Sequence, residues 1–406
     1  MRLKDIVYMN RRTLQETTSP DYDFHYVDIS SVDGLGNVSV PGTSTMFGAA
    51  PSRARRLAPT GATIISTVRT YLRAIGRVPP SQRPLVFSTG FAVLEARPEA
   101  ADSKYLYYLC RSEPFVQHLV ARSVGVSYPA VNPGDIGDFA IDLPAIEEQR
   151  RIANFLDGEV GRIDRLLTLR RQQFATAVER LAARAALSTG RMAAPSRTET
   201  NCQWRLPLRR AIRFIRTGRT PATLEERSAT TSERSIPWYT PAAIDGMLHV
   251  GAAEKVVALP ANEDVPLFPA GSIIVTGIGE SLGKVGFLEH NATGNQQLTA
   301  LKANQRADDR FLAWQLWAAQ DEIRNWAQYS RIRIINNDAL RAFPVHLPLL
   351  HVQIAARRAL DSELTALNQL KTAVEQFTHR ALERRQALIT AAVTGQIDAT
   401  TTRGVD

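Results

Sequence analysis

Cysteine is scarce in this sequence, with only Cys110 and Cys202 among 406 residues. Two thiols cannot build a disulfide framework or a zinc site of several sulfur ligands, which fits a reducing compartment. Long apolar runs are also missing: nowhere do about 18 apolar residues follow one another, as a membrane span needs. The opening MRLKDIVYMNRR lacks the apolar segment of a signal peptide. We therefore expect a cytoplasmic protein that does not enter the membrane.

Acidic residues are absent from two stretches that are rich in arginine. Between Asp33 and Glu95 there is none, and the run from Arg205 to Arg219 has none either. The arginines of the first stretch are Arg53, Arg55, Arg56, Arg69, Arg73, Arg77 and Arg83. With a net charge of +9, this pattern favours a polyanionic partner. The planar guanidinium suits phosphate oxygens and the guanine edge, although the same pattern also fits simple solvated faces.

Catalytic motifs are missing as well. The segment 277–284, GIGESLGK, resembles a phosphate loop in composition, but its spacing fits neither the P-loop nor the dinucleotide fingerprint, so we expect a tight turn there. The seven histidines show no metal-ligand spacing. No Asn-Pro-Pro-Tyr or Asp-Pro-Pro-Tyr tetrapeptide, which an amino-methyltransferase would use, occurs. We expect no catalytic residue, no metal and no cofactor in this chain.

One long segment occurs twice. Residues 143–190 align with residues 347–395 at an offset of 204, and their final glycines align after a slip of one residue. The identical pairs are Leu143 and Leu347, Pro144 and Pro348, Gln149 and Gln353, Leu156 and Leu360, Asp157 and Asp361, and Glu159 and Glu363. A repeat this long indicates a duplicated module, because solenoid units are much shorter.

Both copies of the segment have the apolar periodicity of a long helix. Apolar residues recur every three or four positions, with Glu147 and Glu148 in the first turn of one copy and Gly190 and Gly395 as C-terminal caps. The seam positions that we select are Ile152, Leu156, Ile163, Leu167, Leu360, Leu364, Leu367 and Val374. About 40 residues make a rod of roughly 60 Å. Antiparallel packing of the two helices would bury both seams; a dimerisation coiled coil is the alternative.

The rest of the sequence predicts an α+β fold: two pseudo-symmetric α/β domains separated by two long antiparallel helices that form a coiled-coil spacer. In the first domain we expect strands at 26–29, 62–66, 74–78, 91–94 and 139–143, and one helix from Ser103 to about Ala121. The predicted boundaries are 1–143 and 204–347 for the domains, 144–190 and 348–395 for the helices, 191–203 for a linker and 396–406 for a tail.

This order of elements resembles the specificity subunit of type I restriction-modification systems over essentially the whole chain. The resemblance rests on LPAIEEQRRIANFLD before the first long helix, LPLLHVQIAARRALD before the second and AAVTG at its end. Stretches similar to that family's target-recognition domains are 26–29, 50–55, 66–73, 88–91 and 294–297. The second helix departs from the family pattern, with Leu350-His351-Val352 where the first has Ile146-Glu147-Glu148, which affects its expected partner contacts.

The resemblance implies the partners and the division of labour. Each recognition domain would read one half of a bipartite site in double-stranded DNA, and the helices would set the spacer and dock two modification (methyltransferase) subunits. Those subunits would carry S-adenosylmethionine for adenine N6 methylation, and restriction subunits would add ATP- and Mg-dependent activity. The seam residues would also serve this docking.

For DNA contact we select basic, polar and aromatic residues of the two domains. They are Arg53, Arg55, Arg69, Arg73, Arg122, Ser127, Tyr128, Arg216, Arg219, Lys284, Arg331 and Arg333. Some would touch only phosphates and others would read bases, and the sequence does not separate them. Two other classes stay open: a structural coiled-coil protein with nonspecific DNA binding, and a DNA methyltransferase or nuclease of unrecognised motif.

Overall fold

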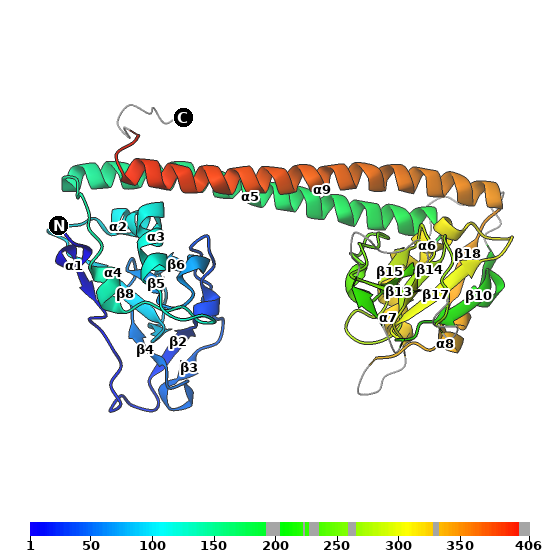
Figure 1. Ribbon diagram of the computed structural model, residues 1–406, viewed down its shortest axis with the longest axis horizontal. Helices are drawn as coiled ribbons and strands as arrows, with labels where there is room; N and C mark the ends of the chain where they lie inside the picture. The colour runs from blue at the N-terminus through cyan, green and yellow to red at the C-terminus, as the bar shows by residue number, and fades with distance from the viewer. Residues whose placement is uncertain (192–203, 222–223, 227–234, 259–264, 328–332, 398–406) are drawn as a thin grey trace. The chain divides into compact units, whose positions relative to one another are not determined.

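The computed structural model describes residues 1–191, 204–221, 224–226, 235–258, 265–327 and 333–397 (Figure 1). The chain divides into two compact units. Unit 1 comprises Met1–Arg170 together with Glu375–Asp406, and unit 2 comprises Arg171–Val374. The division falls inside both long helices, α5 (Ile146–Ser188) and α9 (Leu350–Val393). Each unit therefore combines a globular domain with part of each long helix.

Unit 1 contains two four-stranded sheets. The first is antiparallel with the order β1 (Val7–Met9), β8 (Phe91–Ala96), β5 (Thr63–Ser66), β6 (Ile75–Arg77). The second has the order β3 (Thr45–Met46), β2 (Asp23–Val27), β7 (Leu85–Ser88), β4 (Ala54–Leu57), and its central pair β2 and β7 is parallel. All residues of β5 and β7 are buried, as expected for strands covered on both faces.

The helices of unit 1 differ from the prediction at one place. They are α1 (Leu3–Ile6), α2 (Ser103–Arg111), α3 (Glu113–Arg122) and α4 (Pro133–Gly137). The single helix predicted from Ser103 to Ala121 was wrong, because Ser112 is extended at φ −65° and ψ 150°. Pro114 lies in the first turn of α3, where it needs no hydrogen bond to a preceding turn, but it cannot continue α2.

Two predicted strands of unit 1 also need correction. The run 26–29 is strand only up to Val27, because Asp28 caps a 3-10 turn by accepting a hydrogen bond from the amide of Ser30. The run 139–143 forms no strand, and its one ladder contact is an isolated bridge from Ala140 to Arg2. A strand needs a partner along its length, and this run finds one only at a single residue.

Unit 2 is built on the same frame. Its antiparallel sheet has the order β10 (Ile212–Thr217), β17 (Leu298–Ala303), β14 (Ile273–Thr276), β15 (Val285–Phe287). A second sheet has the order β11 (Glu225–Glu226), β13 (Lys255–Ala258), β12 (Ser235–Tyr239), β16 (Thr293–Gly294), with β12 and β16 parallel. A ribbon pairs β9 (Trp204–Pro207) with β18 (Pro344–Leu347), and the helices are α6 (Asp309–Ala318), α7 (Gln320–Trp326) and α8 (Asn337–Ala342).

The two domains share an antiparallel four-stranded sheet, and each has a second sheet with a parallel strand pair. The second sheets differ in their edge strands. The inner orders β1-β8-β5-β6 and β10-β17-β14-β15 correspond strand for strand. In the second sheets, β4 is added beside β7 in unit 1, whereas β11 is added beside β13 in unit 2. The duplication inferred from the sequence therefore extends to the topology, and the divergence is concentrated at the sheet edges.

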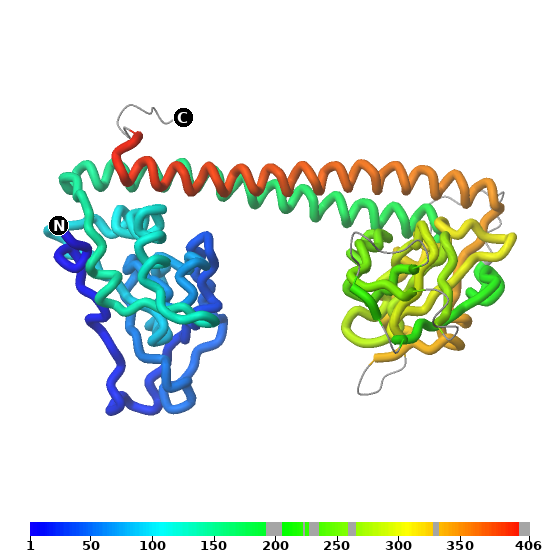
Figure 2. Tube along the Cα trace, viewed as in Figure 1, coloured from blue at the N-terminus to red at the C-terminus, as the bar shows by residue number. Residues whose placement is uncertain are grey.

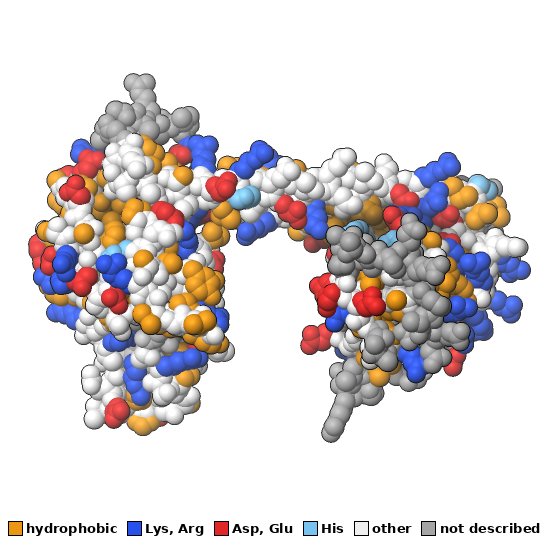
Figure 3. All heavy atoms as spheres, viewed as in Figure 1, with side chains coloured by type: hydrophobic (Ala, Val, Ile, Leu, Met, Phe, Trp, Pro, Cys, Tyr) orange, Lys and Arg blue, Asp and Glu red, His pale blue; other side chains and the backbone are white. Residues whose placement is uncertain are grey.

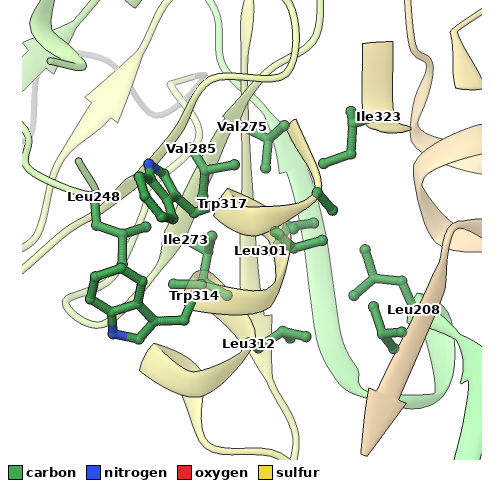
Figure 4. Packing of buried hydrophobic residues seen from close by; sticks show 14 of the residues in the cluster. Leu208, Leu248, Ile273, Val275, Val285, Leu301, Leu312, Trp314, Trp317 and Ile323 are labelled. Atoms are coloured by element: carbon green, nitrogen blue, oxygen red, sulfur yellow. The ribbon is translucent and has the colours of Figure 1, made fainter. Parts of the chain in front are cut away.

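Each domain is packed on both long helices. In unit 2 the core around Trp314 and Trp317 (Figure 4) includes Leu181 and Ala185 of α5 and Leu360, Leu364 and Leu367 of α9. In unit 1 the core around Tyr105 and Phe115 includes Ile152, Ala153, Leu156 and Val160 of α5 and Ile389, Ala392 and Val393 of α9. At about 1.5 to 3 kcal/mol for each large apolar side chain buried, this contact is a major part of each unit's stability.

The two long helices pack antiparallel. In unit 1 the start of α5 lies beside the end of α9 (Figure 2), and the Arg385 Nε atom donates to Asp164 Oδ1 over 3.1 Å. In unit 2 the end of α5 lies beside the start of α9, and Arg184 Nε is 2.8 Å from Glu363 Oε1. The eight seam residues selected from the sequence are buried except Val374, which is half-buried. Their burial within the chain means that a partner subunit would contact the helices through other side chains.

Both helices end in the same cap, as predicted. Gly190 and Gly395 have positive φ values of 77° and 73°. The amides of the next residues, Arg191 and Gln396, reach back to the carbonyls of Ala186 and Ala391, 2.9 and 2.8 Å away. These are the bonds of a Schellman motif, which glycine favours because it lacks a Cβ atom.

A buried glutamine ties each domain to its long helix. Gln149, 1% exposed, donates through Nε2 to the carbonyls of Ala100 and Pro144, and its Oε1 atom accepts from the amide of Asp102. Gln353, 0% exposed, makes the same three bonds to Arg306, Pro348 and Asp308. We name these two sites the glutamine joints.

A carboxylate about two helical turns further along completes each joint. Asp157 accepts from Tyr108 Oη at 2.8 Å and from Lys104 Nζ, and burial together with this carboxylate raises the pKa of Tyr108. Asp361 accepts from Trp314 Nε1 at 2.9 Å and Arg310 Nε at 2.8 Å. The identical pairs of the sequence repeat thus mark the contacts that place α2 on α5 and α6 on α9.

Candidate nucleic-acid interface

The candidate residues of unit 1 centre on two loops at the end of β5. The loop 67–73 contains the 3-10 turn η3 (Thr70–Leu72), and the loop 123–131 lies against it. The amide of Arg69 donates to the carbonyl of Pro129 over 2.7 Å, and the hydroxyls of Thr70 and Ser123 are 2.7 Å apart. Val68 also forms a bridge with Ala130. These contacts hold the two loops as one surface, which we call the paired loops.

The tripeptide Ser88-Thr89-Gly90 connects the paired loops to β4. The amide of Thr89 donates to the carbonyl of Arg53 over 2.8 Å. The carbonyl of Gly90 accepts from the amide and the hydroxyl of Thr67, both at 2.9 Å. A Cβ atom on Gly90 would lie 2.5 Å from Ile29 Cδ1, so a larger residue would require the Ile29 side chain to move. Arg53 and the loop at Thr67 are therefore held by the same turn.

The four arginines selected from the acid-free stretch have different surroundings. Arg53 forms an ion pair with Asp28 at 2.7 Å, and its pKa is raised by hydrogen bonding to Tyr26 and by nearby negative charge. The guanidinium of Arg55 lies over the ring of Phe47 at 4.8 Å. That of Arg73 donates through both Nη atoms to Glu113, at 2.7 and 2.9 Å. This fork, with Gln117, lowers the pKa of Glu113.

Arg69 is held by an aromatic ring instead of a carboxylate. Its guanidinium carbon lies 4.3 Å from the ring centroid of Tyr128. Its Nε atom is buried and has no hydrogen-bond partner among the described residues. Ser127 and Tyr128 are exposed in the neighbouring loop, and Arg122 is exposed at the end of α3, where it contacts His118 at 3.0 Å. The structure thus brings Arg69, Arg73, Arg122, Ser127 and Tyr128 to the paired loops.

The paired loops also carry exposed apolar side chains that the sequence analysis did not select as candidates for DNA contact. They are Tyr71, Leu72, Val124 and Val126. The signal was present, because Tyr71 and Leu72 stand between Arg69 and Arg73, and aromatic side chains interleaved with cations are typical of nucleic-acid surfaces. Basic and apolar side chains both occur on the face of unit 1 that Figure 3 shows.

Unit 2 presents a counterpart of the paired loops. Ile278 bridges to Ile334 as Val68 does to Ala130, and the amide of Ile335 donates to the carbonyl of Gly277 as that of Val131 does to Thr67. The segment 294–297 takes the place of Ser88-Thr89-Gly90, because the carbonyl of Gln297 accepts from the amide of Gly277 over 2.8 Å. The segment 277–284 is a turn between β14 and β15, as expected from its composition.

The candidate cations of unit 2 fall into two groups. Arg219 and Arg333 are exposed beside the counterpart loops, and Arg216 is exposed on β10 with its guanidinium 4.9 Å from the ring of Phe214. Lys284 instead is half-buried and donates to the carbonyl of Ile244 over 3.4 Å. Arg331 lies outside the described residues.

In the part of the chain that the structure describes, no group of three or more His, Cys, Asp or Glu side chains is placed to hold a metal ion. Among the described residues, no helix is long and apolar enough to cross a membrane. What the loop clusters offer is fixed cations, amides and aromatic rings, which can contact phosphates and base edges.

Comparison with known proteins identifies the family. Residues 1–172 and 213–376 match the type I restriction modification DNA specificity domain. The chain belongs to this family, and it is the DNA specificity subunit of a type I restriction-modification system. It is a non-catalytic subunit; S-adenosylmethionine and ATP belong to the modification and restriction subunits of such systems.

Solved structures show the same fold. A chain from a structural study of complex assembly and conformational transition of the type I R-M system is 24% identical, with a TM-score of 0.75 over 98% of this chain and 97% of that chain. The HsdS subunit from Thermoanaerobacter tengcongensis is also 24% identical, with a TM-score of 0.51 over 98% of this chain and 96% of that chain. At such identities the likeness concerns the fold alone.

Proposed function

We propose that each unit reads one half of a bipartite site in double-stranded DNA through its loop cluster. The recognition domains would be residues 1–143 and 204–347, and the long helices 144–190 and 348–395 would set the spacer. The supporting observation is that both units carry the same loop frame with different side chains: Arg69, Tyr71 and Arg73 in unit 1 correspond to Gly279, Ser281 and Gly283 in unit 2. Loops with the same backbone arrangement but different side chains are suited to reading two different half-sites.

The helices also dock partners in this proposal. Two modification subunits would bind the complex of chain and DNA and methylate adenine, and restriction subunits would join them, all in the cytoplasm. Exposed leucines on α5, Leu166 and Leu169, are available for such contacts, since the seam residues are buried. A rigid link between two recognition domains raises the effective concentration of the second domain once the first is bound.

The proposal is tested by mapping methylated adenine in the genome of cells that express this subunit with its modification subunits. The expected result is one asymmetric motif with two defined parts and a fixed gap. Exchanging the residues of the paired loops of unit 1 for those of a relative should change one part of the motif and leave the other part and the gap unchanged. A change in both parts, or a continuous motif, would contradict the proposal.

Binding assays with the purified complex provide a second test. If the candidate arginines contact phosphates, the logarithm of the affinity should fall linearly with the logarithm of the salt concentration, and each lost phosphate contact should reduce the slope by roughly 1. An affinity that does not depend on salt would count against the arginine clusters as DNA contacts.

A further inference from the structure

The backbone of the paired loops contains a conformation that arginine rarely adopts. Arg69 and Arg73 have left-handed φ values of 50° and 56°. Their equivalents at an offset of 210 in unit 2 are Gly279 and Gly283, with φ values of 86° and 87°. The same loop shape is therefore made by glycine in one unit and by arginine in the other. Glycine adopts this conformation without strain and arginine does not.

Backbone strain at a residue other than glycine points to a role of its side chain. For Arg73 the structure shows that role, because both Nη atoms donate to Glu113 and tie the loop to α3. For Arg69 no such bond exists: among the described residues its side chain has no hydrogen bond and no ion pair, only the ring of Tyr128. A purely structural stack would be buried, yet Tyr128 is 68% exposed.

The geometry points to Arg69 as the arginine that reads a guanine in the first half-site, with Tyr128 as the positioning residue that holds its guanidinium; this rests on the proposed function. Three observations support it. The donors of Arg69 are unpaired while the ring restricts their direction, so little freedom is lost on binding. Unlike Arg53 and Arg73 of the same acid-free stretch, Arg69 forms no ion pair with a carboxylate of the described residues. The fork of donors fits the O6 and N7 atoms of guanine, which both accept.

The main test uses Arg69→Gly, because glycine is what unit 2 has at the equivalent position. This variant relieves the backbone strain, so its thermal unfolding temperature should equal or exceed that of the unchanged protein. Methylation mapping in cells, with the modification subunits present, should show that one guanine of the first part of the motif has become degenerate. The preference for guanine at that position should fall roughly 10- to 100-fold. The other part and the gap should stay the same.

Further variants test separately the planar guanidinium of Arg69, its positive charge and the ring of Tyr128 that holds it. Arg69→Lys keeps the charge but not the fork, so it should also relax that position. Tyr128→Phe keeps the ring and should preserve the motif, whereas Tyr128→Ala should relax the position that Arg69→Gly relaxes. Arg83→Ala is the control for the loss of one positive charge. Arg83 precedes β7 at the end opposite Ser88, where it forms an ion pair with Asp23 and contacts Ser44.

The outcomes are distinguishable from failure of the proposed function. If the unchanged system methylates no bipartite motif, the proposed function fails. If it does, and Arg69→Gly leaves every position intact, Arg69 does not read a base. If Arg69→Gly lowers methylation of all sites equally, as loss of a phosphate contact would, the inference is also overturned. If Arg83→Ala relaxes the same position, the effect is one of charge and the inference fails.

Discussion

Replacement of Gln149 by leucine should open the joint of unit 1 and leave that of unit 2 closed. Three part-buried groups would lose their partner: the carbonyls of Ala100 and Pro144 and the amide of Asp102, all within 3.1 Å of the Gln149 side chain. An unsatisfied buried group costs about 1 to 3 kcal/mol, and the lower value for each of these part-buried groups gives a loss of about 3 kcal/mol. Leucine has a similar size, which keeps the cavity contribution small.

Amide hydrogen exchange followed by mass spectrometry measures this loss locally. A loss of about 3 kcal/mol corresponds to roughly 100-fold faster exchange of peptides that cover residues 97–112, because each 1.4 kcal/mol is a factor of ten in the opening equilibrium. Peptides covering 303–316 report on the second joint and should not change. Gln353→Leu should give the reverse pattern. Gln172→Leu is the control, since Gln172 is exposed on the same helix.

Two results would refute the reasoning. Exchange within threefold of the unchanged protein at both joints would show that the buried glutamine bonds contribute little to holding α2 on α5. Equal acceleration in both units would show that the joints do not act independently. Local exchange is the appropriate readout because it reports on each joint separately, whereas one unfolding curve combines the two compact units.

Three further predictions concern charge and backbone. Burial and the neighbouring Arg191 and Arg205 lower the pKa of His346, so the fold favours its neutral form. Unit 2 should therefore lose stability as pH falls below about 6.5, and His346→Gln should flatten this dependence in unfolding curves. Hydrogen bonds from Arg73 and Gln117 lower the pKa of Glu113, so its stabilisation is present above about pH 4.5 and is lost as pH falls through its lowered pKa. Glu113→Gln should therefore be less stable than the unchanged protein at pH 7, and the difference should shrink as pH falls below about 4.5 in the same assay. Gly395→Ala should destabilise the end of α9 by about 1 to 2 kcal/mol, because alanine is strained at the φ value of 73°. No atom lies within 4 Å of the added methyl group, so a steric clash does not contribute, and hydrogen exchange of the last turn measures the loss.

The long helices were the most predictable part of the fold. Their periodicity, the glycine caps and the identical Gln149 and Gln353 were all visible in the sequence, because a helix and its caps depend on residues close in sequence. The function of those glutamines was not visible. It depends on the starts of α2 and α6, more than forty residues away, whose amides and carbonyls meet the glutamine only in the folded domain.

The candidate DNA contacts could be predicted only as a set. Composition selected Arg69 and Arg73 equally, but Glu113, forty residues further on, takes up the guanidinium of Arg73 and not that of Arg69. Lys284 was selected for its charge, and the fold directs it to the carbonyl of Ile244. The break between α2 and α3 has a signal in the sequence, because Pro114 lies at the start of α3. The apolar spacing continues through the break, and it led to the prediction of a single helix.

The division of the chain has a consequence for its synthesis. Unit 1 is completed by residues after 374, whereas residues 171–374 form unit 2. Ile389, Ala392 and Val393 belong to the core of unit 1, together with Ile152 and Leu156. A ribosome that adds about 5 to 20 residues per second needs roughly 10 to 40 s to pass the intervening segment. During that time part of the apolar core of unit 1 is uncovered. The core of unit 1 is therefore completed after that of unit 2, although the synthesis of unit 1 begins first.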